Sequence, residues 1–68
     1  MDMIAIAAKL VALRTKKGDT IAQAAKAMNI STSALGMYET GKRVPRDEVK
    51  VALASYYGVS IEDLFFAS

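Results

Sequence analysis

The stretch that decides the fold is Thr20–Glu39, TIAQAAKAMNISTSALGMYE. It predicts two short helices joined by a tight turn. Thr20 begins the first with a capping box, because its hydroxyl can cap a helical amide while the glutamine three positions later reaches back. Asn29 forms the turn, since Asn tolerates the left-handed conformation that ends a helix. Ser31 then caps the second helix, which we expect over about 32–39.

This second helix has two different faces. At 100° per residue, Leu35 and Tyr38 share one face, which we expect to be buried. The opposite face carries small or uncharged side chains, which are Ser33, Gly36, Met37 and Thr40. Thr32 lies on the flank of this face. Glycine inside a helix costs about 1 kcal/mol relative to alanine. Two explanations of Gly36 stay open, a close approach by another molecule or a tolerated loss of stability.

A cluster of cations, Lys42, Arg43 and Arg46, follows the second helix directly. The formal net charge is only +2, but four of the seven acidic residues lie beyond this cluster. The asymmetry indicates one face directed toward a polyanion; the alternative is a solvated loop of mixed charge. An uncharged helix face followed by cations is what we expect of a helix that lies against DNA bases, with the cations on the flanking phosphates.

The rest of the chain predicts three more helices. The first spans about 3–17, with apolar side chains at helical spacing and Gly18 as its stop. Another runs from about 46 to 57, and the last opens after the cap Ser60 and ends near Phe66. The fold class is therefore all-α, a compact five-helix bundle, and we expect residues 1–68 to form a single domain.

Composition excludes several classes of protein. The 68 residues include no cysteine and no histidine, so disulfides and thiolate or imidazole metal sites are excluded. No apolar run approaches the roughly 18 residues of a membrane-spanning helix, and the start lacks a basic leader, so we expect a cytoplasmic protein. Paired acids lie at helix starts, where the helix dipole favours them. We therefore expect no enzyme, no metal, no cofactor and no small-molecule ligand.

The chain resembles the phage-repressor and Cro-like helix-turn-helix family, often called XRE-type, between Leu10 and Phe65. The resemblance depends on short pieces at matching spacings: Leu13-Arg14 then Gly18, Thr20, Ala25, Met28-Asn29-Ile30-Ser31, Leu35-Gly36-Met37-Tyr38-Glu39, Gly41-Lys42-Arg43 then Pro45, and Gly58-Val59-Ser60 then Leu64-Phe65. It implies a lambda-repressor-like DNA-binding fold with the helix-turn-helix at about 20–39. It also implies operator binding, usually as a dimer.

The resemblance implies roles for individual residues. Base contacts fall, by position, on Thr32, Ser33 and Met37, with Ser31 and Gly36 at the edge of that set. Phosphate contacts are expected from Lys42, Arg43, Arg46 and Thr20. Arg14 and Glu39 match the positions of a structural ion pair that links the first helix to the end of the third.

Some positions depart from the family pattern. Ile21 stands where the family commonly has a phosphate-contacting Gln, and Ala24 replaces the usual Leu. Lys50 occupies a position that is often apolar, so the packing register of the fourth helix is open there.

The sequence therefore predicts a sequence-specific DNA-binding regulator, expected to be a repressor that binds a double-stranded operator as a homodimer. Because the outer face has no Arg, Gln or Asn, we expect modest direct readout, helped by water and DNA shape. The aromatic pair Phe65 and Phe66 is expected in the core, or at a dimer surface where it is exposed. The alternative is a small protein-interaction module, such as an antitoxin-like or adaptor domain, that binds through residues 64–66.

Overall fold

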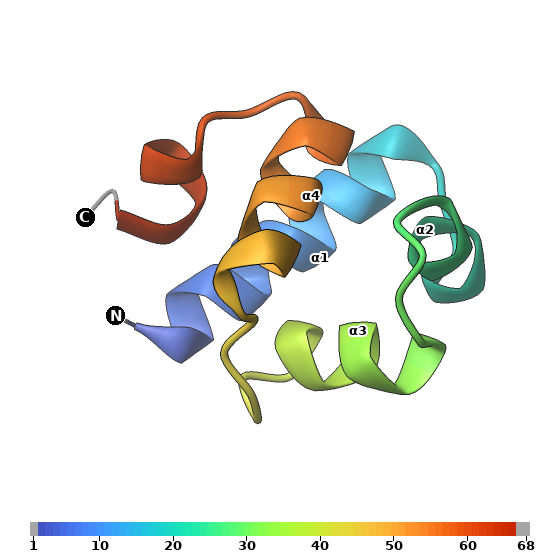
Figure 1. Cartoon of the computed structure of the whole chain (residues 1–68), viewed down its shortest axis with the longest axis horizontal. Coiled ribbons are helices and arrows are strands. Elements are labelled where there is room, and N and C mark those ends of the chain that lie inside the picture. Colours follow the sequence, from blue (N-terminus) through green and yellow to red (C-terminus); the bar gives the residue numbers. More distant parts are fainter. Residues whose placement is uncertain (1, 67–68) are drawn as a thin grey trace.

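The structure is a computed structural model, which describes residues 2–66. Over that range it contains five helical segments and no strand (Figure 1). In chain order these are α1 (Met3–Lys17), α2 (Ile21–Ala27), α3 (Thr32–Glu39), α4 (Asp47–Tyr57) and the short π-helical segment η1 (Glu62–Phe66). The predicted all-α, five-helix fold is confirmed.

Helix α1 packs against three of the other four helical segments of the described chain. It contacts α3, α4 and η1, and it crosses the middle of the molecule in Figure 1. Asp2 caps its start, because one carboxylate oxygen accepts from the backbone N–H groups of Ile4 and Ala5 at 3.0 and 3.1 Å. Gly18 ends the helix in the left-handed conformation, with φ 84°. Both ends lie where the sequence predicts them.

The core cluster of the described residues takes two buried side chains from each helical segment. Its largest fully buried members are Leu10, Leu35, Leu53 and Leu64. Ala24 and Ala25 of α2 are also almost inaccessible. Since alanine has no side chain beyond Cβ, α2 can lie close to its neighbours where the family usually has leucine. Position 24 is therefore fully buried although its side chain is small.

Lys50 settles the register of α4. Its side chain is only 13% exposed, although the next residue, Val51, is 53% exposed. The Lys50 ammonium lies 5.6 and 5.8 Å from the ring centroids of Phe65 and Phe66. Its nitrogen is also 3.7 Å from a carboxylate oxygen of Asp47. The lysine stem thus fills an inward position while its charge contacts aromatic faces.

The last segment differs from the ordinary α-helix expected after Ser60. Ser60 does act as a cap, because its hydroxyl accepts from the Asp63 N–H at 3.0 Å. The segment that follows is a single π-helical turn, in which Leu64 and Phe65 are both buried and Phe66 is 63% exposed. The aromatic pair is therefore divided, with Phe65 in the core and Phe66 on the surface.

Candidate nucleic-acid interface

The start of α2 holds the predicted capping box. The Thr20 hydroxyl oxygen accepts from the Gln23 N–H at 3.1 Å, and the Gln23 side-chain oxygen accepts from the Thr20 N–H at 2.8 Å. Two donors that would otherwise be unpaired are thereby satisfied. Thr20 remains exposed to solvent although it makes both of these hydrogen bonds.

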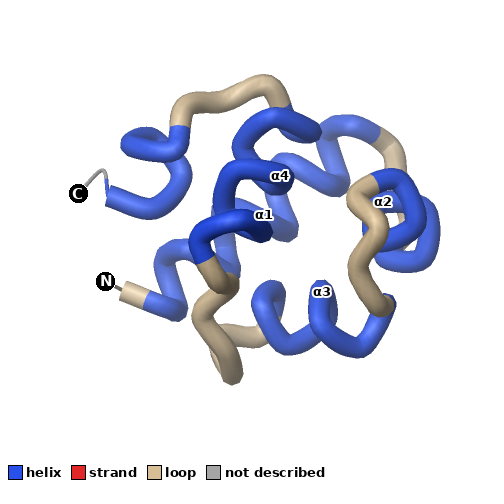
Figure 2. The backbone as a smooth tube through the Cα atoms, viewed as in Figure 1, coloured by secondary structure: helices blue, strands red, loops and turns tan. Residues whose placement is uncertain are grey.

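The turn between α2 and α3 sets the direction in which α3 leaves. Asn29 has φ 56°, the left-handed conformation expected of it. The next N–H, of Ile30, donates to the Ala25 carbonyl at 3.0 Å and closes the end of α2. The Ser31 hydroxyl then accepts from the Ala34 N–H at 3.0 Å and opens α3. Figure 2 shows α3 as a short helix bounded by loops at both ends.

The inner face of α3 is fixed by burial. Leu35 is fully inaccessible, Tyr38 is 5% exposed and Glu39 is 8% exposed. This face packs against α1 and α2. Glu39 is the only buried charged residue of the described chain, so it needs a partner.

Arg14 is that partner. Its Nε donates to both carboxylate oxygens of Glu39, at 2.8 and 3.1 Å, and one terminal nitrogen donates to the Asp19 carbonyl at 2.9 Å. The hydrogen bond to Glu39 raises the pKa of Arg14. Because the pair joins α1 to the last residue of α3, it holds the end of α3 in place. The outer face of α3 stays accessible.

The outer face of α3 makes little use of the rest of the molecule. Thr32 and Ser33 are exposed, and Met37 is 40% exposed. A methyl group built at Gly36 would meet, within 4 Å, no atom of residues 2–66 beyond its chain neighbours and the backbone of its own helix. Packing within the described chain therefore does not require glycine there. The structure brings these predicted base-contacting positions onto one accessible surface.

The predicted cations lie in the loop that follows. The Lys42 N–H donates to the Met37 carbonyl at 3.0 Å, so this loop starts directly on the last turn of α3. Lys42, Arg43 and Arg46 are all exposed. Arg46 lies 3.9 Å from Glu48, and both side chains are largely solvated, which makes this a weak pair. Arg46 thus has an acidic neighbour, whereas Lys42 and Arg43 directly follow α3.

Sequence reasoning missed a polar cluster between the end of α1 and the end of α4, near the ion pair. The Tyr56 hydroxyl donates to the Asp19 carboxylate, and the Lys17 ammonium lies 4.6 Å from the Tyr56 ring centroid. The Tyr57 hydroxyl is buried and has no hydrogen-bond partner among the described residues. Burial raises the pKa of Tyr57 to about 12. These contacts join residues far apart in the chain, so no local pattern indicated them.

Comparison with known proteins identifies the family. The helix-turn-helix family model matches residues 10–64, which is most of the chain. The chain therefore belongs to the XRE/Cro-like helix-turn-helix family. That membership implies the lambda-repressor-like fold and a DNA partner, and the family is not enzymatic. No curated protein and no solved structure matches the chain. Within residues 2–66, no helix is long and apolar enough to cross a membrane.

Proposed function

We propose that this protein is a sequence-specific transcriptional repressor that inserts α3 into the major groove of a double-stranded operator. The observation that carries the proposal is the outer face of α3, which is exposed and uncharged and adjoins the exposed cations Lys42 and Arg43. A helix enters the major groove when its outer side chains reach base edges and nearby cations meet phosphates.

Base contacts are proposed for Thr32, Ser33 and Met37. The hydroxyls can donate or accept, and Met37 can contact a thymine methyl. Ser31 already accepts a hydrogen bond from Ala34, so its hydroxyl keeps its O–H donor and one acceptor lone pair for a base. Gly36 allows the helix backbone to lie close to the groove, because open space adjoins it.

Phosphate contacts are proposed for Lys42 and Arg43 first. Arg46 is a weaker candidate because Glu48 lies beside it. Thr20 is exposed at the start of α2, and its hydroxyl can still donate to a phosphate oxygen while it caps the helix. Each phosphate neutralised steepens the fall of log affinity with log salt by about 0.9.

A homodimer on a two-fold symmetric site completes the proposal. Half-site centres then lie about 34 Å apart, on one side of the duplex. Phe66 and Ile4 are 63% and 78% exposed, and the start of α1 and η1 lie on the same side of the molecule (Figure 1). Phe66 in particular is an exposed apolar side chain of the kind that a second copy would cover. Phe66→Ala should then shift the sedimentation coefficient to that of a monomer, whereas a retained dimer would exclude this contact.

The proposed function is tested by titrating labelled random-sequence duplexes and following fluorescence anisotropy over a salt series. Ser33→Glu places a carboxylate against the major groove of the DNA, so affinity for DNA should fall at least tenfold. Ser55→Glu makes the same change on the exposed face of α4 and should change affinity much less. No salt-dependent complex with any duplex, or equal losses in the two variants, would overturn the proposal and favour the protein-interaction alternative.

A further inference from the structure

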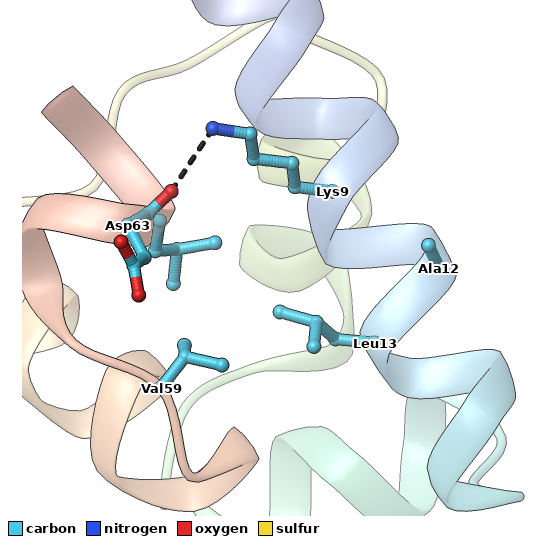
Figure 3. Close-up of a pocket in the computed structure, with 6 residues that line it drawn as sticks. Lys9, Ala12, Leu13, Val59 and Asp63 are labelled. Atoms are coloured by element: carbon cyan, nitrogen blue, oxygen red, sulfur yellow. Dashed lines mark hydrogen bonds between the residues drawn. The ribbon is translucent and has the colours of Figure 1, made fainter. Parts of the chain in front are cut away.

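A groove runs along α1 where this helix faces the connection between α4 and η1. Figure 3 shows one part of it, a hollow of about 260 Å³. Its lining residues are Lys9, Ala12, Leu13, Val59, Asp63 and Leu64. A second hollow of about 380 Å³ shares Leu13 and Val59 with the first. The two hollows are therefore neighbouring parts of one groove.

The α1 side of the groove is a regular helical stripe. Lys9, Ala12, Leu13 and Lys16 follow the i, i+3, i+4, i+7 spacing that sets side chains on one side of a helix. Lys17 extends the stripe in the second hollow. From Lys9 to Lys17 an α-helix rises about 12 Å. That length matches about two turns of a second helix lying beside α1.

The floor of the groove is apolar and its edge is cationic. Ala12 is exposed, while Leu13 and Val59 are only partly buried, so apolar surface is open to a partner. The Lys9 ammonium donates to the Asp63 carbonyl at 2.9 Å and spans one end (Figure 3). Lys16 and Lys17 are exposed at the other end. Asp63 is the only acidic side chain among the described residues that line either hollow.

We propose that this groove binds an acidic amphipathic helix of a partner protein. The apolar side chains of that helix would cover Ala12, Leu13 and Val59, and its carboxylates would pair with Lys16 and Lys17. Helices bind grooves in this way through anchors at i, i+3 or i+4, and i+7. The excess of lysine on the groove edge selects an acidic helix over a basic one.

The groove and the proposed DNA surface lie on different sides of α1. In Figure 1 the connection that follows α4 lies above α1, and α3 lies below it. A partner helix in the groove would therefore leave the outer face of α3 accessible. The protein can in this way hold DNA and a second protein together, so the groove adds a function to the DNA surface and does not replace it.

The test uses a fluorescein-labelled helical peptide of about 14 residues with leucine on one face and glutamate on the other, and its counterpart with lysine for each glutamate. Titration against the full chain should give weak binding of the acidic peptide and at least about tenfold weaker binding of the basic one. Equal binding of both peptides, or of neither, would overturn the proposal.

Matched variants separate groove binding from simple charge attraction. Ala12→Gln fills the groove floor at an exposed helix position without changing charge. It should therefore weaken binding of the acidic peptide at least fivefold and leave DNA affinity unchanged. Lys16→Glu should weaken the peptide, whereas Lys26→Glu on α2, which makes the same charge change, should not. Lys42→Ala should weaken DNA binding and leave peptide binding unchanged. Loss of peptide binding in Lys42→Ala with full binding in Ala12→Gln would assign the peptide to the cations beside α3 and contradict the groove.

Discussion

The two faces of α3 make opposite demands on the same eight residues. On the inner face, Leu35, Tyr38 and Glu39 are buried, and the last of these pairs with Arg14. On the outer face, Ser33 and Met37 are accessible, and nothing in the described chain fills the space beside Gly36. Changes on the inner face should therefore alter the free energy of unfolding, and changes on the outer face should alter DNA affinity.

The largest expected effect is on the inner face. Glu39→Ala leaves the Arg14 guanidinium in a largely buried site without its carboxylate partner. Removing one member of a buried pair typically costs 3–5 kcal/mol, so we expect the free energy of unfolding in urea to fall by about 3 kcal/mol.

A double replacement supplies the control for this destabilisation. Arg14→Met combined with Glu39→Leu removes both charges and keeps apolar volume, so much of the stability should return. An unchanged urea midpoint in Glu39→Ala would show that the pair contributes nothing to the fold.

The next effect concerns the cations beside the outer face. Replacing Lys42 and Arg43 together by alanine should make the slope of log affinity against log salt shallower, by about 0.9 for each phosphate that the protein no longer neutralises. The free energy of unfolding should stay within about 0.5 kcal/mol of the original, because both side chains are exposed. An unaltered salt slope would mean that other residues bind the phosphates.

Gly36→Ala should change stability and binding in opposite directions. Alanine is favoured over glycine inside a helix by about 1 kcal/mol, and the added methyl group meets no other element of the described chain. Urea unfolding should therefore show a more stable protein. The same methyl group would lie between α3 and the major groove of the DNA, so affinity for DNA should fall. A rise in stability with unchanged affinity would mean that Gly36 is only a tolerated defect.

The smallest effect is a dependence on alkaline pH. Burial raises the pKa of Tyr57 to about 12, from an ordinary value of 10.0. The unfolded chain thus releases this proton before the folded chain does. Its contribution to stability is complete below about pH 10 and disappears as pH rises toward 12. Tyr57→Phe should reduce this alkaline destabilisation and change stability little at pH 7, since the hydroxyl has no partner in residues 2–66. Identical pH profiles for the two proteins would contradict this.

Local signals predicted most of the fold. The cap at Ser31, the turn at Asn29 and the helix stop at Gly18 each depend on neighbours a few positions away, so the sequence alone indicates them. The pairing of Arg14 with Glu39 follows from the family resemblance, because spacing alone is also compatible with two separate surface charges.

Contacts between distant segments were not predictable in this way. The bond from Tyr56 to Asp19, the Lys50 ammonium over two rings and the Lys9 bond to the Asp63 carbonyl all require knowledge of how the helices pack. The periodicity of α3 indicates its accessible face, but the contacts of that face with individual bases remain predictions.

Selection of bound duplexes from a random-sequence pool tests the role of α3 most directly. Repeated rounds with the unaltered protein should enrich a two-fold symmetric sequence whose half-site centres lie about 34 Å apart, which is one turn of the duplex. The same selection with Ser33→Glu should enrich no such sequence. Failure of the unaltered protein to enrich any sequence, or recovery of the same sequence by Ser33→Glu, would contradict DNA reading by the outer face of α3.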